Sequence, residues 1–149
     1  MITISLSVNR ILETVYAFCA ADYFTSKEER PAVLGRGQEA ALRRLISNAA
    51  AEMIYRLTPP AVGTSLINEP DADIITIDFK LPEDFDMLLT IRPCLESALA
   101  ASVMAVAWTG NNAEMAKGYA DTYNKNLENL LRTLPVLGKP GRIEPWPIR

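Results

Sequence analysis

Histidine is absent from this 149-residue sequence, and its absence removes several kinds of active site. Without an imidazole, no Ser-His-acid triad and no Cys-His pair can form, and zinc centres that depend on histidine are excluded. General acid–base catalysis would fall to carboxylates, lysine or tyrosine. The glycine spacings of dinucleotide-binding and phosphate-binding loops are also missing. We therefore expect a non-enzymatic protein with no catalytic residues, no cofactor and no metal site.

Cysteine is scarce as well, and neither Cys19 nor Cys94 belongs to a CxxC or Cys-His motif. Each lies in an apolar helical pattern, where a free cysteine usually behaves as a small buried side chain. Reduced thiols are the simpler interpretation, although the sequence leaves a disulfide open. Arg10 and Glu13 interrupt the apolar stretch near the N-terminus, so a secretory signal is not expected. These features favour a cytoplasmic protein.

The 15 lysines and arginines are outnumbered by 18 acidic residues, so the net charge is −3. This balance argues against sequence-specific binding of nucleic acid. A solvated helix face explains the visible basic residues better than a binding patch does; they are Arg36, Arg43, Arg44 and Arg56. With 49% hydrophobic residues, the chain can build the core of one ordinary domain.

Apolar periodicity predicts four helices, over residues 8–24, 37–57, 82–108 and 112–134. The third is apolar nearly all round from Ala98 to Trp108, which predicts neighbours on every side. That run is too short to span a membrane, so no membrane partner is expected. Pro93 lies inside the third pattern and predicts a kink or a break there.

The fourth helix carries the clearest stripe of apolar residues, and its charges fall mostly on the other side. Asn111 is the predicted N-cap. Asp121–Lys125 and Glu128–Arg132 are acid-before-base pairs at the favourable spacing of four residues. The stripe recurs at steps of three and four and consists of Met115, Tyr119, Tyr123, Leu127, Leu130, Leu131 and Leu134.

Residues that alternate between apolar and polar predict a β-hairpin over 62–80, between the second and third helices. Alternation in residues 2–7 indicates a short strand or an extended arm. Four prolines make residues 135–149 an extended tail. The predicted fold is mainly α: a four-helix bundle-like body within a single domain of residues 1–134, a small inserted β-hairpin, and the extended C-terminal tail.

Two glutamates, Glu52 and Glu96, are embedded in strongly apolar surroundings. They could form a buried pair around a pocket, although a position at a helix edge is favoured for each. A carboxylate-based ligand- or metal-binding helical domain is therefore one alternative function. A small bacterial helical interaction module is another.

The order of parts resembles a known family. After two helices and a strand insertion, Leu81-Pro82-Glu83-Asp84-Phe85-Asp86 opens an apolar helix, and a helix rich in alanine and tyrosine follows from Ala113 to Leu134. Over residues 8–134 this resembles the head–tail connector (head-completion, adaptor) proteins of tailed bacteriophages and prophages. The resemblance implies a virion assembly protein that forms a homo-oligomeric ring and binds portal or tail proteins. It also implies a place first in the bacterial cytoplasm and then in the virion.

Subunits of a ring meet head to tail through two different patches. The hairpin and the C-terminal tail are the natural candidates, because each projects apolar residues from the predicted body. The candidate partner-binding residues are Ile67, Ile75, Ile77, Ile143, Trp146 and Ile148.

Overall fold

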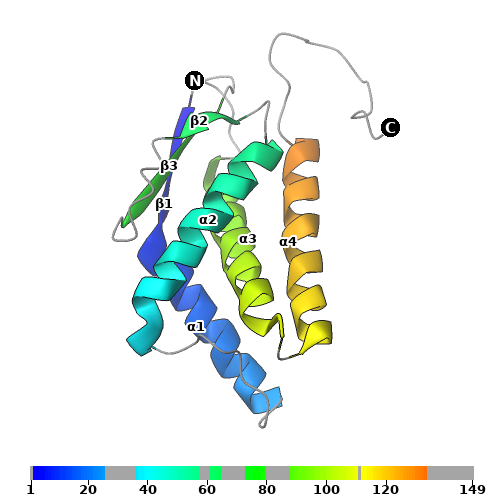
Figure 1. The fold of residues 1–149 in the computed structure, drawn as a ribbon. Coiled ribbons are helices and arrows are strands. Elements are labelled where there is room, and N and C mark those ends of the chain that lie inside the picture. Colours follow the sequence, from blue (N-terminus) through cyan, green and yellow to red (C-terminus); the bar gives the residue numbers. More distant parts are fainter. Residues whose placement is uncertain are drawn as a thin grey trace.

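The computed structural model describes residues 2–25, 36–57, 61–64, 73–79, 88–110 and 112–133 (Figure 1). The elements, in chain order, are β1 (Ile2–Ser7), α1 (Val8–Thr25), a short 3-10 helix (Arg36–Gln38), α2 (Glu39–Leu57), β2 (Ala61–Thr64), β3 (Ile74–Phe79), α3 (Leu88–Trp108) and α4 (Ala113–Thr133). The predicted fold class is confirmed: four helices, with an antiparallel hairpin between α2 and α3. The predicted tail lies outside the described residues.

β1 joins the hairpin to make a three-stranded sheet of order β1-β3-β2. It pairs antiparallel with β3, from Ile2 opposite Phe79 to Ser7 opposite Ile74. Residues 2–7 are thus a strand rather than a loose arm. One face of the sheet belongs to the core, through the side chains of Ile4, Leu6, Ile75, Ile77 and Phe79, each at most 3% exposed.

α3 is the central element of the molecule. It packs against α1, α2, α4 and β1, and most residues from Leu95 to Trp108 are buried. The prediction of neighbours on every side holds for most of this stretch, but Val106 is 53% exposed. By length and composition alone, Thr90–Trp108 could also cross a membrane, but 56% of that stretch is buried inside the protein. Its place in the core accounts for its apolar composition.

α3 runs without a break through Pro93, so a split at this residue is wrong. Pro93 is exposed and lies five residues after Leu88, the first helical residue described. A proline near the start of a helix removes a single backbone hydrogen bond. The predicted start of this helix at Pro82 falls outside the described residues.

α4 begins at a cap one residue later than the sequence predicts. Asn112 Oδ1 accepts the amide hydrogens of Glu114 and Met115 at 3.1 and 3.2 Å, so Asn112 is the N-cap, and the predicted cap Asn111 lies outside the described residues. Gly110 makes the turn before it with a positive φ of 96°, which glycine adopts without strain.

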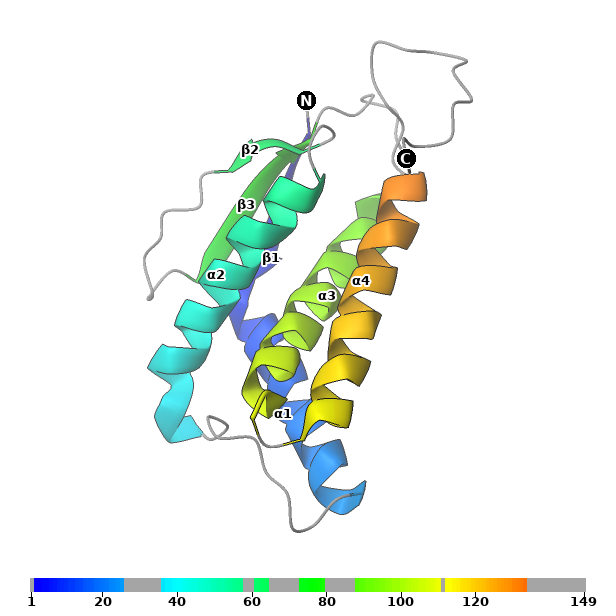
Figure 2. The same cartoon turned by 45° about the vertical axis from the view of Figure 1, so that its right-hand side comes forward.

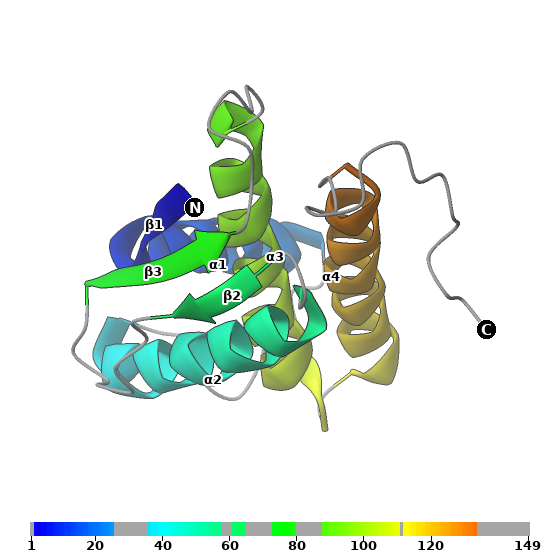
Figure 3. The same ribbon diagram turned by 90° about the horizontal axis from the view of Figure 1, so that it is seen from above.

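The three views agree that α4 lies at one side of the molecule, with α3 between it and the sheet (Figures 1, 2 and 3). The predicted apolar stripe of α4 is confirmed for its described members, which are buried or partly buried. Both cysteines are free thiols in the structure. Cys19 contacts Met104, and Cys94 contacts the carbonyl oxygen of Asn126.

Candidate functional site

Asp22, Glu52 and Glu96 each accept hydrogen bonds from elements distant in the sequence, and each is the centre of a polar network. Glu96 joins α3 to the junction of β1 and α1. Asp22 joins α1 to α3 and α4. Glu52 joins α2 to α4. These networks are the candidate sites: Asp22 and Glu96 are buried, and buried carboxylates serve either catalysis or structure, whereas Glu52 is more exposed.

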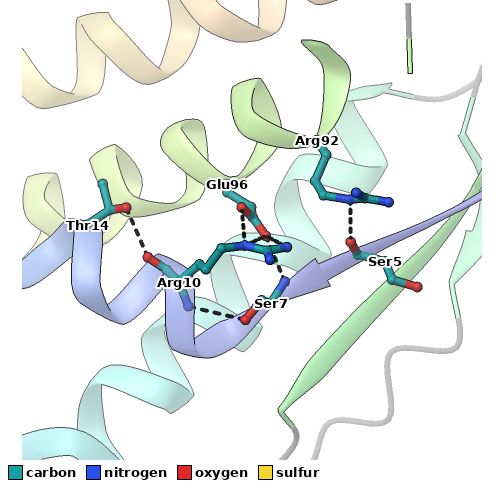
Figure 4. A network of polar contacts seen from close by, with 6 residues as sticks. All are labelled: Ser5, Ser7, Arg10, Thr14, Arg92 and Glu96. Atoms are coloured by element: carbon teal, nitrogen blue, oxygen red, sulfur yellow. Dashed lines mark hydrogen bonds and ion pairs between the residues drawn. The ribbon is translucent and has the colours of Figure 1, made fainter. Parts of the chain in front are cut away.

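Glu96 is 8% exposed and fully engaged. Its Oε2 accepts the backbone N–H of Ser7 at 2.7 Å, and its two oxygens accept the Nε and Nη2 hydrogens of Arg10 at 3.1 Å. The carboxylate raises the pKa of Arg10 by its hydrogen bond and its charge. Figure 4 shows Glu96 and Arg92 both pointing from α3 toward the end of β1. A carboxylate that accepts charge-assisted bonds from fixed donors is held in place rather than poised to react.

Arg92 completes this junction by donating its Nε hydrogen to the carbonyl oxygen of Ser5 at 3.0 Å (Figure 4). β1 is an edge strand, and it bonds to β3 on one side only. On the other side, α3 side chains bind the Ser5 carbonyl and the Ser7 amide. The network therefore covers backbone groups that an open edge would offer to another strand.

Asp22 is buried, and its Oδ2 accepts hydrogen bonds from two aromatic residues. Trp108 Nε1 donates at 3.1 Å and the Tyr119 hydroxyl at 2.7 Å. Burial, followed by the hydrogen bond and charge of Asp22, raises the pKa of Tyr119 well above its usual 10. Burial, and then the charge of Asp22, raises the pKa of Cys19 to about 11. Cys19 therefore stays a protonated, unreactive thiol at neutral pH.

Glu52 accepts a hydrogen bond from the Tyr123 hydroxyl. Burial is the main cause that raises the pKa of Tyr123, and the bond to Glu52 adds to it. Arg56 lies over the Tyr123 ring, 5.3 Å from its centroid, and donates to Asn124 Oδ1 at 2.6 Å. This network connects α2 to α4 alongside the contact of α4 with α3.

The structure does not bring Glu52 and Glu96 together as a buried pair. Glu52 has a side chain that is 52% exposed and bonds to α4, as a helix-edge residue would. Glu96 is buried, so the helix-edge position favoured for it is wrong, and it bonds to β1 and α1. Among the described residues, no three His, Cys, Asp or Glu side chains gather in a way that could hold a metal ion.

Two of the four candidate basic residues are engaged within the chain. Arg43 donates to Asp73 and Asn9, and Arg56 belongs to the Glu52 network. Arg44 is exposed, and the side chain of Arg36 is outside the description. Arg43 and Arg56 therefore do not form a shared basic patch.

Two of the candidate partner-binding residues are in the core, which corrects their assignment. Ile75 is 3% and Ile77 0% exposed, because the two-residue period of β3 turns both toward the helices. Their neighbour Ile74 is 61% exposed and is the outward apolar residue of this strand. Ile67, Ile143, Trp146 and Ile148 lie outside the described residues, so their role stays a prediction.

Sequence reasoning missed Asp22, although one signal pointed to it. The buried stripe of α1 continues from Val15 through Phe18 and Cys19, and Asp22 follows at the same spacing. An acid on an apolar stripe predicts a buried, hydrogen-bonded carboxylate. No such local signal exists for Arg10 and Arg92, because their partners are more than 80 residues away.

Comparison of the chain with protein-family models, with curated proteins and with solved structures finds no match. A proposal for the function of this chain therefore rests on its own residues and on the resemblance in the order of its helices and strands.

Proposed function

We propose that the protein is a non-enzymatic head–tail connector of a tailed bacteriophage or prophage, which assembles as a ring between portal and tail proteins. One observation supports this most: the order of elements is two helices, a hairpin, an apolar helix, and an amphipathic helix packed on it. This is the order on which the resemblance depends.

The polar networks also fit an assembly protein better than an enzyme. Asp22, Glu52 and Glu96 accept bonds that connect separate elements of one fold. Glu52 and Glu96 belong to separate networks, so the alternative of a shared carboxylate site for a metal or ligand receives no support from their positions.

The test is the assembly state of the full chain, alone and with the portal protein encoded beside it. Mass photometry and negative-stain electron microscopy should reveal a ring of many identical subunits, either alone or on the portal. Portal, capsid and terminase genes should lie next to this one. A protein that stays monomeric at high concentration and does not bind the portal would contradict the proposal.

Removal of Lys139–Arg149 should weaken ring assembly, because a ring needs two different patches and the tail carries the apolar candidates Ile143, Trp146 and Ile148. Mass photometry of the truncated chain should show fewer rings at equal concentration. The control is circular dichroism, which should show the same helical signal in both chains. Undiminished rings after truncation would assign the ring contact to another surface.

A further inference from the structure

The outer face of α4 carries six charged side chains whose signs alternate along the helix. They are Glu114, Lys117, Asp121, Lys125, Glu128 and Arg132, and all six are exposed. Steps of three or four residues place them on one strip of the helix surface. The strip has three positive and three negative charges, so it has no net charge.

None of these six side chains forms an ion pair with any part of the chain that the structure describes. The predicted pairs Asp121–Lys125 and Glu128–Arg132 have the right spacing but are not formed. Figures 1, 2 and 3 show no helix or strand on the outer side of α4. The strip thus keeps its charges available for a partner.

Gly118 adds a second, independent observation on the same face. Glycine inside a helix is less favourable than alanine. A Cβ added at Gly118 would meet nothing within 4 Å, so packing within the described chain does not require glycine there. A glycine on an exposed helix face allows the backbone of another helix to approach closely.

We propose that this face of α4 docks antiparallel on the same face of a second copy, about a two-fold axis level with Tyr123. In this arrangement Glu114 faces Arg132 of the second copy, Lys117 faces Glu128, and Asp121 faces Lys125. The symmetry repeats each pair, so all six side chains of each copy meet an opposite charge. The positions match to within one residue, about 1.5 Å along the axis, which long side chains bridge.

A parallel arrangement satisfies fewer charges. In register it opposes like charges, and shifted by one step it leaves Glu114 of one copy and Arg132 of the other unpaired. The antiparallel contact is also isologous, so it closes as a dimer. It is independent of the proposed connector function, since a ring needs two different patches. Failure of one proposal leaves the other intact.

Charge reversal within α4 provides the decisive experiment. An acidic variant, K117E/K125E, and a basic variant, D121K/E128K, each place like charges opposite one another in the homodimer. Mixed together, the two variants pair every charge again. Sedimentation of the full chain at about 50 mM salt should show self-association at least about tenfold weaker in each variant alone. The mixture should form a one-to-one complex.

Wild-type self-association should fall at least about tenfold between about 50 and 500 mM salt, because exposed charges are screened. Lys117→Glu alone reverses one charge of the strip and should weaken the dimer, and Arg44→Glu, which reverses one exposed charge on α2, is its matched control. The control should leave the dimer unchanged. The proposal is overturned if the mixture does not associate, if salt has no effect, or if Arg44→Glu weakens the dimer as much as Lys117→Glu.

Gly118→Ala tests the close approach without a change of charge. The added methyl group favours the helix of the monomer, so the melting temperature at low concentration should rise. Self-association should weaken several-fold, because the methyl group separates the two helices. An unchanged association constant would overturn the proposed axis.

Discussion

α3 and α4 are consecutive helices of the same length, 21 residues each, yet the molecule uses them in opposite ways. α3 has helices or strands on several sides, and its polar side chains Arg92 and Glu96 form hydrogen bonds with β1. α4 buries only Tyr123, Leu127 and Leu130 and turns its charges outward. The difference shows that α3 organises the fold, whereas α4 leaves a charged face exposed. Substitutions in the two helices should therefore differ in kind as well as in size.

The largest effect is expected inside α3. Leu99 is fully buried, so Leu99→Ala should lower the free energy of unfolding by about 2–5 kcal/mol through lost burial and a cavity. Val106 lies on the same helix but is 53% exposed, and Val106→Ala should cost less than about 1 kcal/mol. Urea unfolding of both variants measures the contrast. Similar losses at the two positions would contradict the central place of α3.

Loss of a polar contact of α3 should lower the free energy of unfolding by nearly as much as Leu99→Ala does. Glu96→Gln removes the charge that binds Arg10 and leaves the Ser7 amide with a weaker acceptor, at a cost of about 2–3 kcal/mol. Glu52→Gln is the matched control: its side chain is 52% exposed, and the loss should stay below about 1 kcal/mol. Hydrogen exchange adds a local measure, since the Ser7 amide should exchange faster only in Glu96→Gln. Equal protection of that amide in the two variants would argue against the bond.

This contrast also explains what the sequence could predict. The extents of α1, α2 and α4 and the strand β3 follow from apolar periods of 3.6 and 2, which are local properties. The pairing of β1 with β3 and the bonds of Asp22 to Trp108 and Tyr119 join residues more than 65 apart. No local pattern encodes such contacts. The assignment of Ile75 and Ile77 to a partner fails because alternation predicts a buried face but does not predict which element covers it.

Two tyrosines help to hold α4 against its neighbours. Alkaline pH should therefore lower the free energy of unfolding. The pKa values of Tyr119 and Tyr123 are raised above 10 in the folded state. The folded state therefore holds these protons more tightly than the unfolded state does. Their contribution is complete below pH 10 and is lost as the pH rises further, because the unfolded tyrosines ionise first. The unfolding free energy should therefore fall between pH 10 and 11, with the smaller share of the loss from the partly exposed Tyr119.

The comparison of variants isolates this effect from other groups that titrate at high pH. Tyr119→Phe and Tyr123→Phe should each flatten the fall in unfolding free energy between pH 10 and 11. Tyr55, which is 82% exposed, is the matched control, and Tyr55→Phe should keep the wild-type slope. Three identical slopes would mean that the buried hydroxyls do not hold α4.

The smallest effect is expected where α4 begins. Asn112→Ala removes the acceptor for the amides of Glu114 and Met115 and should lower the unfolding free energy by about 1 kcal/mol. Asn111→Ala is the informative control, because the sequence pattern alone points to Asn111 as the cap. Thermal unfolding of the two variants should place the loss at Asn112. A larger loss at Asn111 would restore the sequence-based cap, and it would move the start of α4 one residue toward α3.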